Sequence, residues 1–251
     1  MSDLNEVLEE EKQAPEPYEL TGSRATTAFF VWFVSQLIFG FILGVYSGFY
    51  GEDSPITTDD IGVLSVYGTA VCLCFWVFKD VSKGGVDYQR VIGFQKGDFT
   101  IANALFWVFI AFVAIRVASG LYASLQPEAV ELIQNGAGEK MLTASKDGGI
   151  GIMAILTYLM VIIVAPIIEE IVFRGYIQNS LEKKYNPQIA VLITSVLFAI
   201  IHFNLAVFPL YFILGVGFGV LFVRTRSLWT VILLHILNNS LAVVYQLFFV
   251  A

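Results

Sequence analysis

Three short motifs in the second half of the chain combine side chains capable of acid–base chemistry within apolar sequence. In chain order they read Glu169-Glu170-x-x-x-Arg174, Phe198-x-x-x-His202 and His235-x-x-x-Asn239. The two histidines are the only ones among the 251 residues. Ionisable groups are costly to keep in membrane-type segments, so their recurrence at helical spacing indicates a functional site.

The spacing within each motif predicts which side chains meet. Residues four apart share a helix face, so Glu170 should pair with Arg174, and His235 should lie beside Asn239. Glu169 is one position earlier than Glu170 and points about 100° away from it. We therefore expect the two carboxylates to have different partners, with Glu170 neutralised by the arginine and Glu169 free.

A glutamate, two histidines and an asparagine that converge could hydrolyse an amide bond. The free glutamate would take a proton from water, one histidine would share that work, and the other histidine and the asparagine amide would donate hydrogen bonds to the developing oxyanion. The chain has neither an HExxH nor a Gly-x-Ser-x-Gly motif, which zincins and many serine hydrolases use. A zinc ion held by Glu169, His202 and His235 is the alternative, because all three are acceptable zinc ligands.

The composition indicates which elements must position these side chains. The chain is 57% hydrophobic and 14% charged, with a mean hydropathy of +0.75, which is too apolar for a soluble domain. About 20 apolar residues of helix cross the hydrocarbon layer. Spans are therefore predicted in the segments that hold no Asp, Glu, Lys or Arg, and in one that holds only Arg116. The charge-free segments are 25–51, 61–78, 149–168, 185–223 and 227–251, and the segment with Arg116 is 99–125.

The predicted fold is an all-α, polytopic transmembrane helix bundle. Segment 185–223 is too long for one crossing and should break around residues 204–209, which gives seven spans, or eight if another long piece divides. Strands of a membrane barrel would alternate apolar and polar residues, whereas residues 161–164 lie in a continuous apolar run. The fourth helix is expected to run unbroken from about Gly149 to about Lys184.

The distribution of basic residues predicts the orientation in the membrane. The loop at 52–60 has no Lys or Arg, whereas the loop at 79–98 has four. The positive-inside rule then places the amino terminus in the cytoplasm, with residues 1–24 as an acidic cytoplasmic tail and the basic turns at 183–187 and 224–227 on the same side. The net charge of −7 argues against a nucleic-acid partner, which would require clustered basic charge.

The helix rise predicts that the motif residues meet at a similar depth. Glu169 precedes and His202 follows the turn after Lys184 by about fifteen residues, or roughly 22 Å at 1.5 Å per residue. His235 lies about nine residues, or roughly 13 Å, from the turn at 224–227. We therefore expect a site below the membrane surface that opens toward the cytoplasm.

The three motifs, in this order on successive hydrophobic segments, resemble the signature motifs of CPBP-type intramembrane endopeptidases. That family includes the type II CAAX prenyl proteases and bacteriocin-processing relatives. The resemblance covers residues 149–245 and does not extend to the first three helices. It implies a membrane-embedded glutamic peptidase, with residues 25–251 as a transmembrane protease domain in the cytoplasmic or an endomembrane membrane. It also implies that the substrate is a peptide or membrane protein and that the protein contacts membrane lipids. No cofactor is implied.

The resemblance assigns a role to each motif residue. Glu169 would activate the attacking water with help from His202, while the oxyanion would be stabilised by His235 and Asn239. Asn238 could exchange parts with Asn239 if the last helix were rotated, but Asn239 is preferred because it shares a face with His235. Glu170 and Arg174 would hold the site together, and Phe198 would pack beside it.

A non-enzymatic interpretation stays open at this stage. A proton-coupled transporter, or an immunity or scaffold protein, also places Glu, His and Arg within a helix bundle. Carriers of this kind usually show inverted repeats and interrupted helices, which the sequence does not reveal. Arg116 has no catalytic spacing and is interpreted as an interhelical or snorkelling partner.

Overall fold

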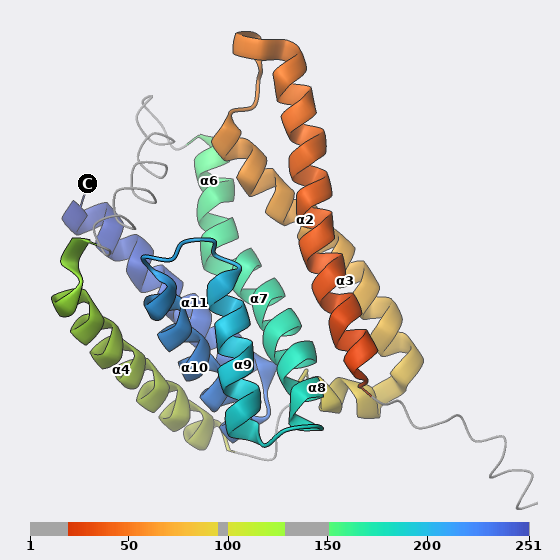
Figure 1. Ribbon diagram of the computed structural model, residues 1–251, viewed down its shortest axis with the longest axis vertical. Coiled ribbons are helices and arrows are strands. Elements are labelled where there is room, and N and C mark those ends of the chain that lie inside the picture. The colour runs from red at the N-terminus through yellow and green to blue at the C-terminus, as the bar shows by residue number, and fades with distance from the viewer. Residues whose placement is uncertain (1–19, 95–99, 129–150, 251) are drawn as a thin grey trace, which may run out of the picture.

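The computed structural model describes residues 20–94, 100–128 and 151–250, and these form helices without a strand (Figure 1). Most of the predicted acidic tail lies outside the described residues. Six helical segments of the described chain are long and apolar enough to cross a membrane, which confirms the polytopic helix bundle. They are Gly22–Tyr50, Thr58–Lys83, Ile101–Leu125, Ile152–Glu182, Phe208–Thr225 and Leu228–Phe248.

The first three long helices are regular. Helix α2 covers Gly22–Tyr50 and is followed by the short 3₁₀ turn η1, Gly51–Asp53. Helix α3 covers Thr58–Val91, and α4 covers Ile101–Leu125. Thr21 and Thr100 accept hydrogen bonds from the first-turn amides of α2 and α4 and so cap them.

The long segment 185–223 divides as predicted, but its first half is short. Helix α9, Pro187–Ile200, is followed after a loop by α10, Phe208–Thr225. The 14 residues of α9 extend about 21 Å, less than the hydrocarbon thickness. The helix stops there because Phe203 has a positive φ of 50°, which a helix cannot contain.

The fourth span runs without a loop from Ile152 to Glu182, but it alternates between α-helical and π-helical turns. The order is α6 (Ile152–Leu159), η2 (Met160–Val164), α7 (Ala165–Glu170), η3 (Ile171–Gln178) and α8 (Asn179–Glu182). Pro166 stands in the first turn of α7, and its missing amide proton accounts for a local adjustment of the backbone ladder. Wider π-turns are common at functional sites, and here they flank the Glu169-Glu170 pair.

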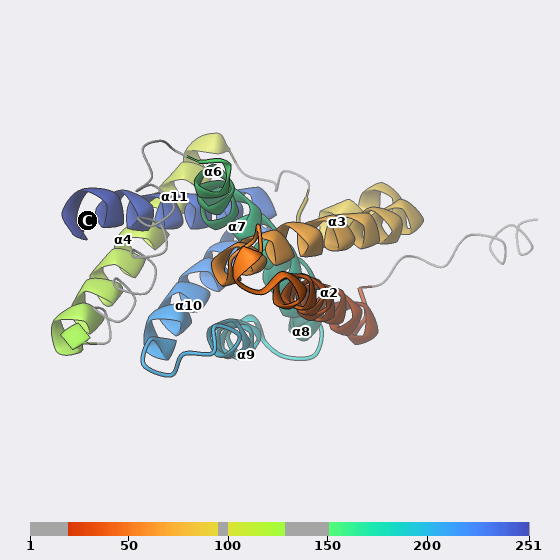
Figure 2. The ribbon, with the colours of Figure 1, turned by 90° about the horizontal axis from the view of Figure 1, so that it is seen from above.

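The motif-bearing helices form the centre of the bundle. Helix α11, Leu228–Tyr245, and its π-helical end η4, Gln246–Val250, pack with α10 against the fourth span. The α2/α3 hairpin lies against one side of this centre, and α4 covers the other side, packed on α10 and α11 (Figures 1 and 2). All three motifs are therefore brought to one interior region.

Close helix approach depends on glycines of α10. A Cβ atom at Gly215 would lie 2.9 Å from the Cα of Ser195 in α9, and one at Gly217 would lie 2.5 Å from the side chain of Ile115 in α4. Small residues at such crossings let membrane helices pack in van der Waals contact. These contacts hold α9 and α4 on either side of α10.

Candidate active site

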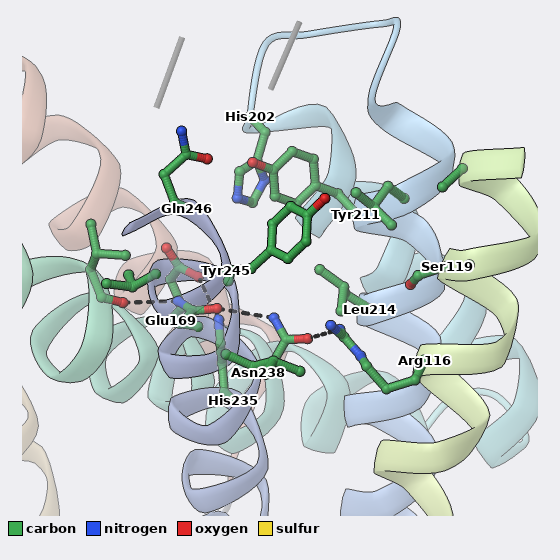
Figure 3. Close-up of a pocket in the computed structure, with 18 of the residues that line it drawn as sticks. Arg116, Ser119, Glu169, His202, Tyr211, Leu214, His235, Asn238, Tyr245 and Gln246 are labelled. Atoms are coloured by element: carbon green, nitrogen blue, oxygen red, sulfur yellow. Dashed lines mark hydrogen bonds and ion pairs between the residues drawn. The ribbon is translucent and has the colours of Figure 1, made fainter. Parts of the chain in front are cut away.

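A cavity of about 600 Å³ lies among the helices that carry the three motifs (Figure 3). Its wall is mostly apolar, with polar groups from five separate helical segments. Five of the seven motif residues line it: Glu169, Phe198, His202, His235 and Asn239. The remaining two, Glu170 and Arg174, are fully buried beside it. The structure thus brings the sequence-predicted site together.

The buried pair of Glu170 and Arg174 is formed as predicted. Arg174 Nη1 lies 3.0 Å from Glu170 Oε1, and both side chains have no exposed surface. Arg174 Nη2 also donates to the carbonyl of Gly215 at 3.1 Å, and its guanidinium lies 4.8 Å and 5.3 Å from the ring centroids of Phe198 and Phe218. A cation so enclosed needs its carboxylate, because an unpaired buried charge is costly.

The two carboxylates share a partner, although the helix spacing predicts different partners for them. His235 Nδ1 lies 2.8 Å from Glu170 Oε1, and His235 Nε2 lies 3.9 Å from Glu169 Oε2. The prediction of different partners was therefore right for Arg174, which pairs with Glu170, but wrong for His235. The cause is the depth at which α11 packs, which places the imidazole between two carboxylates that point in different directions from their own helix.

His235 is held rigidly in this position. The ring of Phe218 stacks on the imidazole at a centroid distance of 4.5 Å and an interplanar angle of 28°. Because the Glu170 carboxylate accepts a hydrogen bond, His235 Nδ1 carries the proton that it donates. The other ring nitrogen, Nε2, then faces Glu169 and the cavity.

His202 presents its second nitrogen in the same way. Its Nδ1 lies 2.7 Å from the carbonyl oxygen of Phe198, an acceptor, so Nδ1 donates and Nε2 carries the lone pair of the neutral ring. Tyr211 stacks on the imidazole at 3.6 Å and 18°. The predicted contact between Phe198 and His202 is present, with ring centroids 5.0 Å apart.

The two asparagines of α11 belong to one hydrogen-bonded row. Asn239 Nδ2 donates to the carbonyl of Val161 at 2.8 Å, and Asn238 Nδ2 donates to Asn239 Oδ1 at 3.1 Å. Arg116 donates to Asn238 Oδ1. Both asparagines line the cavity, and each amide nitrogen has two protons, so Asn239 keeps one N–H for a further acceptor.

Two residues that line the cavity were not predicted to belong to the site. Arg116 was interpreted as an interhelical partner, and its bond to Asn238 confirms that interpretation, but it also lines the cavity. The only signal for it was its charge inside an apolar segment. Tyr211, which holds the His202 ring, had no signal in the sequence, because a tyrosine in an apolar helix is ordinary.

The cavity opens at the end of the bundle opposite to the expected one. Its lining includes Gly120 and Ala123 near the end of α4, Leu210 in the first turn of α10, and Gln246 beyond α11. In Figure 1 the ends of α4 and α11 and the start of α10 lie at the end of the bundle that holds the α9–α10 loop, away from the turn between α8 and α9. No residue of the basic turns at 183–187 and 224–227 lines the cavity, which argues against the predicted opening toward them.

The basic end of the bundle is closed by packing. Four aromatic side chains with no more than 1% exposed surface fill the space between the site and the basic turns: Phe173, Tyr176, Phe218 and Phe222. Gly93 has a φ of +86°, and its carbonyl accepts from the amide of Leu228 at 2.8 Å, which ties the chain after α3 to the start of α11. Sequence spacing gives depth along a helix, but it does not show which end side chains fill.

The proposed zinc ligands do not form a preassembled set. Within the part of the chain that the structure describes, no three His, Cys, Asp or Glu side chains are placed to hold one metal ion. The chemistry available at the site comes from a carboxylate at Glu169, two imidazole nitrogens and the amide of Asn239.

Comparisons with known proteins bear on the segment that carries the motifs. Residues 151–241 match the family model described as type II CAAX prenyl endopeptidase, Rce1-like. The chain is 42% identical over 85 residues to the protein named "Putative membrane peptidase YdiL" of Bacillus subtilis (strain 168), and 34% identical over 91 residues to the membrane-embedded CAAX protease MroQ of Staphylococcus aureus (strain USA300). No solved structure matches the chain.

The resemblance inferred from the three motifs is thereby confirmed for this segment, which contains all of them. Each alignment covers 34% of this chain, together with 35% of the Bacillus protein and 37% of the Staphylococcus protein. The matched part spans only about a third of the length of the curated relatives, so the likeness concerns the motif-bearing segment and not the first three helices.

Proposed function

We propose that this protein is an intramembrane endopeptidase in which Glu169 activates a water molecule to hydrolyse a peptide bond. The observation that carries the proposal is the convergence of Glu169, His202, His235 and Asn239 on one cavity among apolar helices. The match of residues 151–241 to a family of prenyl endopeptidases supports the same reaction.

The charges of the buried cluster fit this chemistry. Arg174 and Glu170 neutralise each other, and one proton shared by Glu169 and His235 leaves the whole cluster neutral, as burial requires. When that proton is on His235, Glu169 is a carboxylate that can act as a base, and the imidazolium presents Nε2–H to the cavity. A single proton position therefore prepares both the base and the oxyanion donor.

Hydrolysis then proceeds as follows. Glu169 removes a proton from water, whose oxygen bonds to the carbonyl carbon of the substrate, while the lone pair of His202 Nε2 orients the water. The oxyanion receives hydrogen bonds from His235 Nε2–H and the remaining amide proton of Asn239. The proton taken by Glu169 passes to the amide nitrogen as the carbon–nitrogen bond breaks, which restores the carboxylate.

The cavity wall indicates the class of substrate. Leu210, Leu214, Leu241 and Val243 are among its lining residues, and most of its surface is apolar. Such a wall suits an apolar or lipid-modified peptide segment that enters from the membrane, because transfer of apolar surface to an apolar pocket is favourable. We therefore assign a membrane-associated or lipid-modified peptide as the substrate class.

The direct test is proteolysis by purified protein in nanodiscs, with a library of apolar and prenylated peptides analysed by mass spectrometry. Glu169→Gln should lower turnover by about 10²- to 10⁴-fold, the usual contribution of a general base, and should bind substrate about equally well. Glu182→Gln is the matched control, because Glu182 lies on the same span outside the cavity.

A chelator arm decides between the two ways of activating water. If Glu169 is the base, a chelator should leave turnover unchanged. Loss of turnover with a chelator, restored by zinc, would make Glu169, His202 and His235 metal ligands instead. Full turnover of the Glu169→Gln protein would refute the proposed function.

A further inference from the structure

Arg116 is a cation in the wall of the cavity without an acidic partner among the described residues. Its guanidinium donates to Asn238 Oδ1, a neutral acceptor, and lies 5.6 Å from the ring centroid of Phe112. Its Nε is buried and has no hydrogen-bond partner within the described structure. A charged side chain inside a membrane span is costly and is usually paired. An anion bound beside Arg116 would offset this cost.

Ser119 adds a second unsatisfied donor at the same place. It lies one helical turn after Arg116, and residues three apart share a helix face. Both residues line the cavity, and the Ser119 hydroxyl is buried with no partner within the described structure. Figure 3 shows this pair on the α4 side of the cavity, across from Glu169 and His235.

We propose that Arg116 and Ser119 form a subsite that binds a carboxylate of the peptide substrate. This inference rests on the proposed function and adds to it the position of a negative charge in the substrate. The planar guanidinium offers several N–H donors in a fixed fork that matches a carboxylate, and the hydroxyl supplies one more. The carboxylate can come from a free carboxy terminus or from an Asp or Glu side chain.

A purely structural role would not need this charge. The bond to Asn238 Oδ1 uses one guanidinium proton, which a neutral amide side chain could also supply. The buried Arg174 shows how the same fold treats a structural arginine, since that guanidinium is paired with Glu170 at 3.0 Å. Arg116 differs because it faces the space that the substrate would occupy.

Peptide binding to the inactive Glu169→Gln protein tests the subsite directly. Three pools of fluorescent apolar decapeptides are compared by anisotropy in phosphatidylcholine nanodiscs: one with a free carboxy terminus, one with a carboxy-terminal amide, and one amidated pool with a single Glu. At least one carboxylate pool should bind about tenfold or more tightly than the neutral amide pool, as expected for a charge-assisted hydrogen bond. The pool that binds identifies the source of the carboxylate.

Variants in the same background separate charge recognition from folding. Arg116→Gln should abolish the preference for the carboxylate pool, Arg116→Lys should keep part of it, and Ser119→Ala should reduce it. Arg224→Gln is the control, because it removes an exposed arginine of α10 that does not line the cavity. If Arg116 were merely structural, Arg116→Gln would weaken the binding of all three pools by the same factor. The ratio of their affinities would then be unchanged.

Three results would overturn the inference: equal binding of charged and neutral pools, no binding of any pool, or a preference that survives in Arg116→Gln. Suppose that phosphatidylglycerol copurifies with the unsubstituted protein but not with Arg116→Gln, while the ratio of peptide affinities stays the same in both. That result would instead assign Arg116 to a lipid phosphate. Cleavage of acid and amide peptides at equal rates by the unsubstituted protein would keep the proposed function and reject the subsite. Peptide binding that depends on Arg116, with no cleavage of any peptide, would keep the subsite and reject the proposed function.

Discussion

Removal of the Arg174 side chain is the sharpest test of how the site is held together. In Arg174→Ala, the fully buried Glu170 carboxylate loses its 3.0 Å ion pair, and the Gly215 carbonyl loses a donor at 3.1 Å. Breaking a buried pair by deleting one partner costs about 3–5 kcal/mol. We expect a loss within this range. An unpaired carbonyl and a lost guanidinium–aromatic contact raise the cost, whereas the hydrogen bond that Glu170 keeps from His235 Nδ1 at 2.8 Å lowers it.

The assay is reversible unfolding in mixed micelles, with helix content followed during a denaturing detergent titration. A loss of about 4 kcal/mol would be a large share of the stability of an ordinary folded protein. Arg174→Lys should recover only part of the loss, because a lysine ammonium lacks the planar fork that contacts both Glu170 and Gly215. The double variant Glu170→Gln/Arg174→Met should be more stable than Arg174→Ala, because it leaves no unpaired charge.

The ion pair between Arg226 and Glu182 supplies the matched control. The Arg226 side chain is half exposed, and the nearly buried Glu182 keeps a hydrogen bond from Gln178 at 3.0 Å, so Arg226→Ala should lower the free energy of unfolding by less than Arg174→Ala does. If Arg174→Ala were as stable as Arg226→Ala, the buried Glu170–Arg174 pair would not be essential to the stability of the fold.

Three further predictions concern the oxyanion donor, helix packing and the side on which the cavity opens. Asn239→Ala should lower kcat about 10²- to 10³-fold with little change in KM; a rise in KM alone would assign the amide to substrate binding. Gly215→Ala should lower the free energy of unfolding by about 1–3 kcal/mol in the same assay, because its Cβ would lie 2.9 Å from the backbone of α9. Gly120→Ala is the control, because its Cβ would meet nothing within 4 Å. Equal stability of the two variants would contradict this prediction. In a cysteine-free background, an impermeant maleimide should label Lys184→Cys and Leu205→Cys from opposite sides of the membrane, and labelling of both from one side would be the contrary result.

The sequence by itself determined the class of fold and the residues of the site. Long charge-free segments can lie only in an apolar solvent, so the helical membrane bundle follows from composition. The break of segment 185–223 into α9 and α10 followed from its length. The motif residues were found because ionisable groups are rare in such segments, and their spacing of four predicted the Glu170–Arg174 pair.

Only the tertiary structure decided how these residues share partners and where the cavity opens. The position of His235 between Glu169 and Glu170 depends on how deeply α11 packs against the fourth span, and periodicity within one helix contains no information about the offset between two helices. The closed end of the bundle depends on which aromatic side chains interdigitate, and Tyr211 and Arg116 reach the site from helices without a motif. Side-chain spacing is a local property of one helix, whereas the shape of a cavity is set by the packing of several helices. The members of the site could therefore be predicted from the sequence, but their geometry could not.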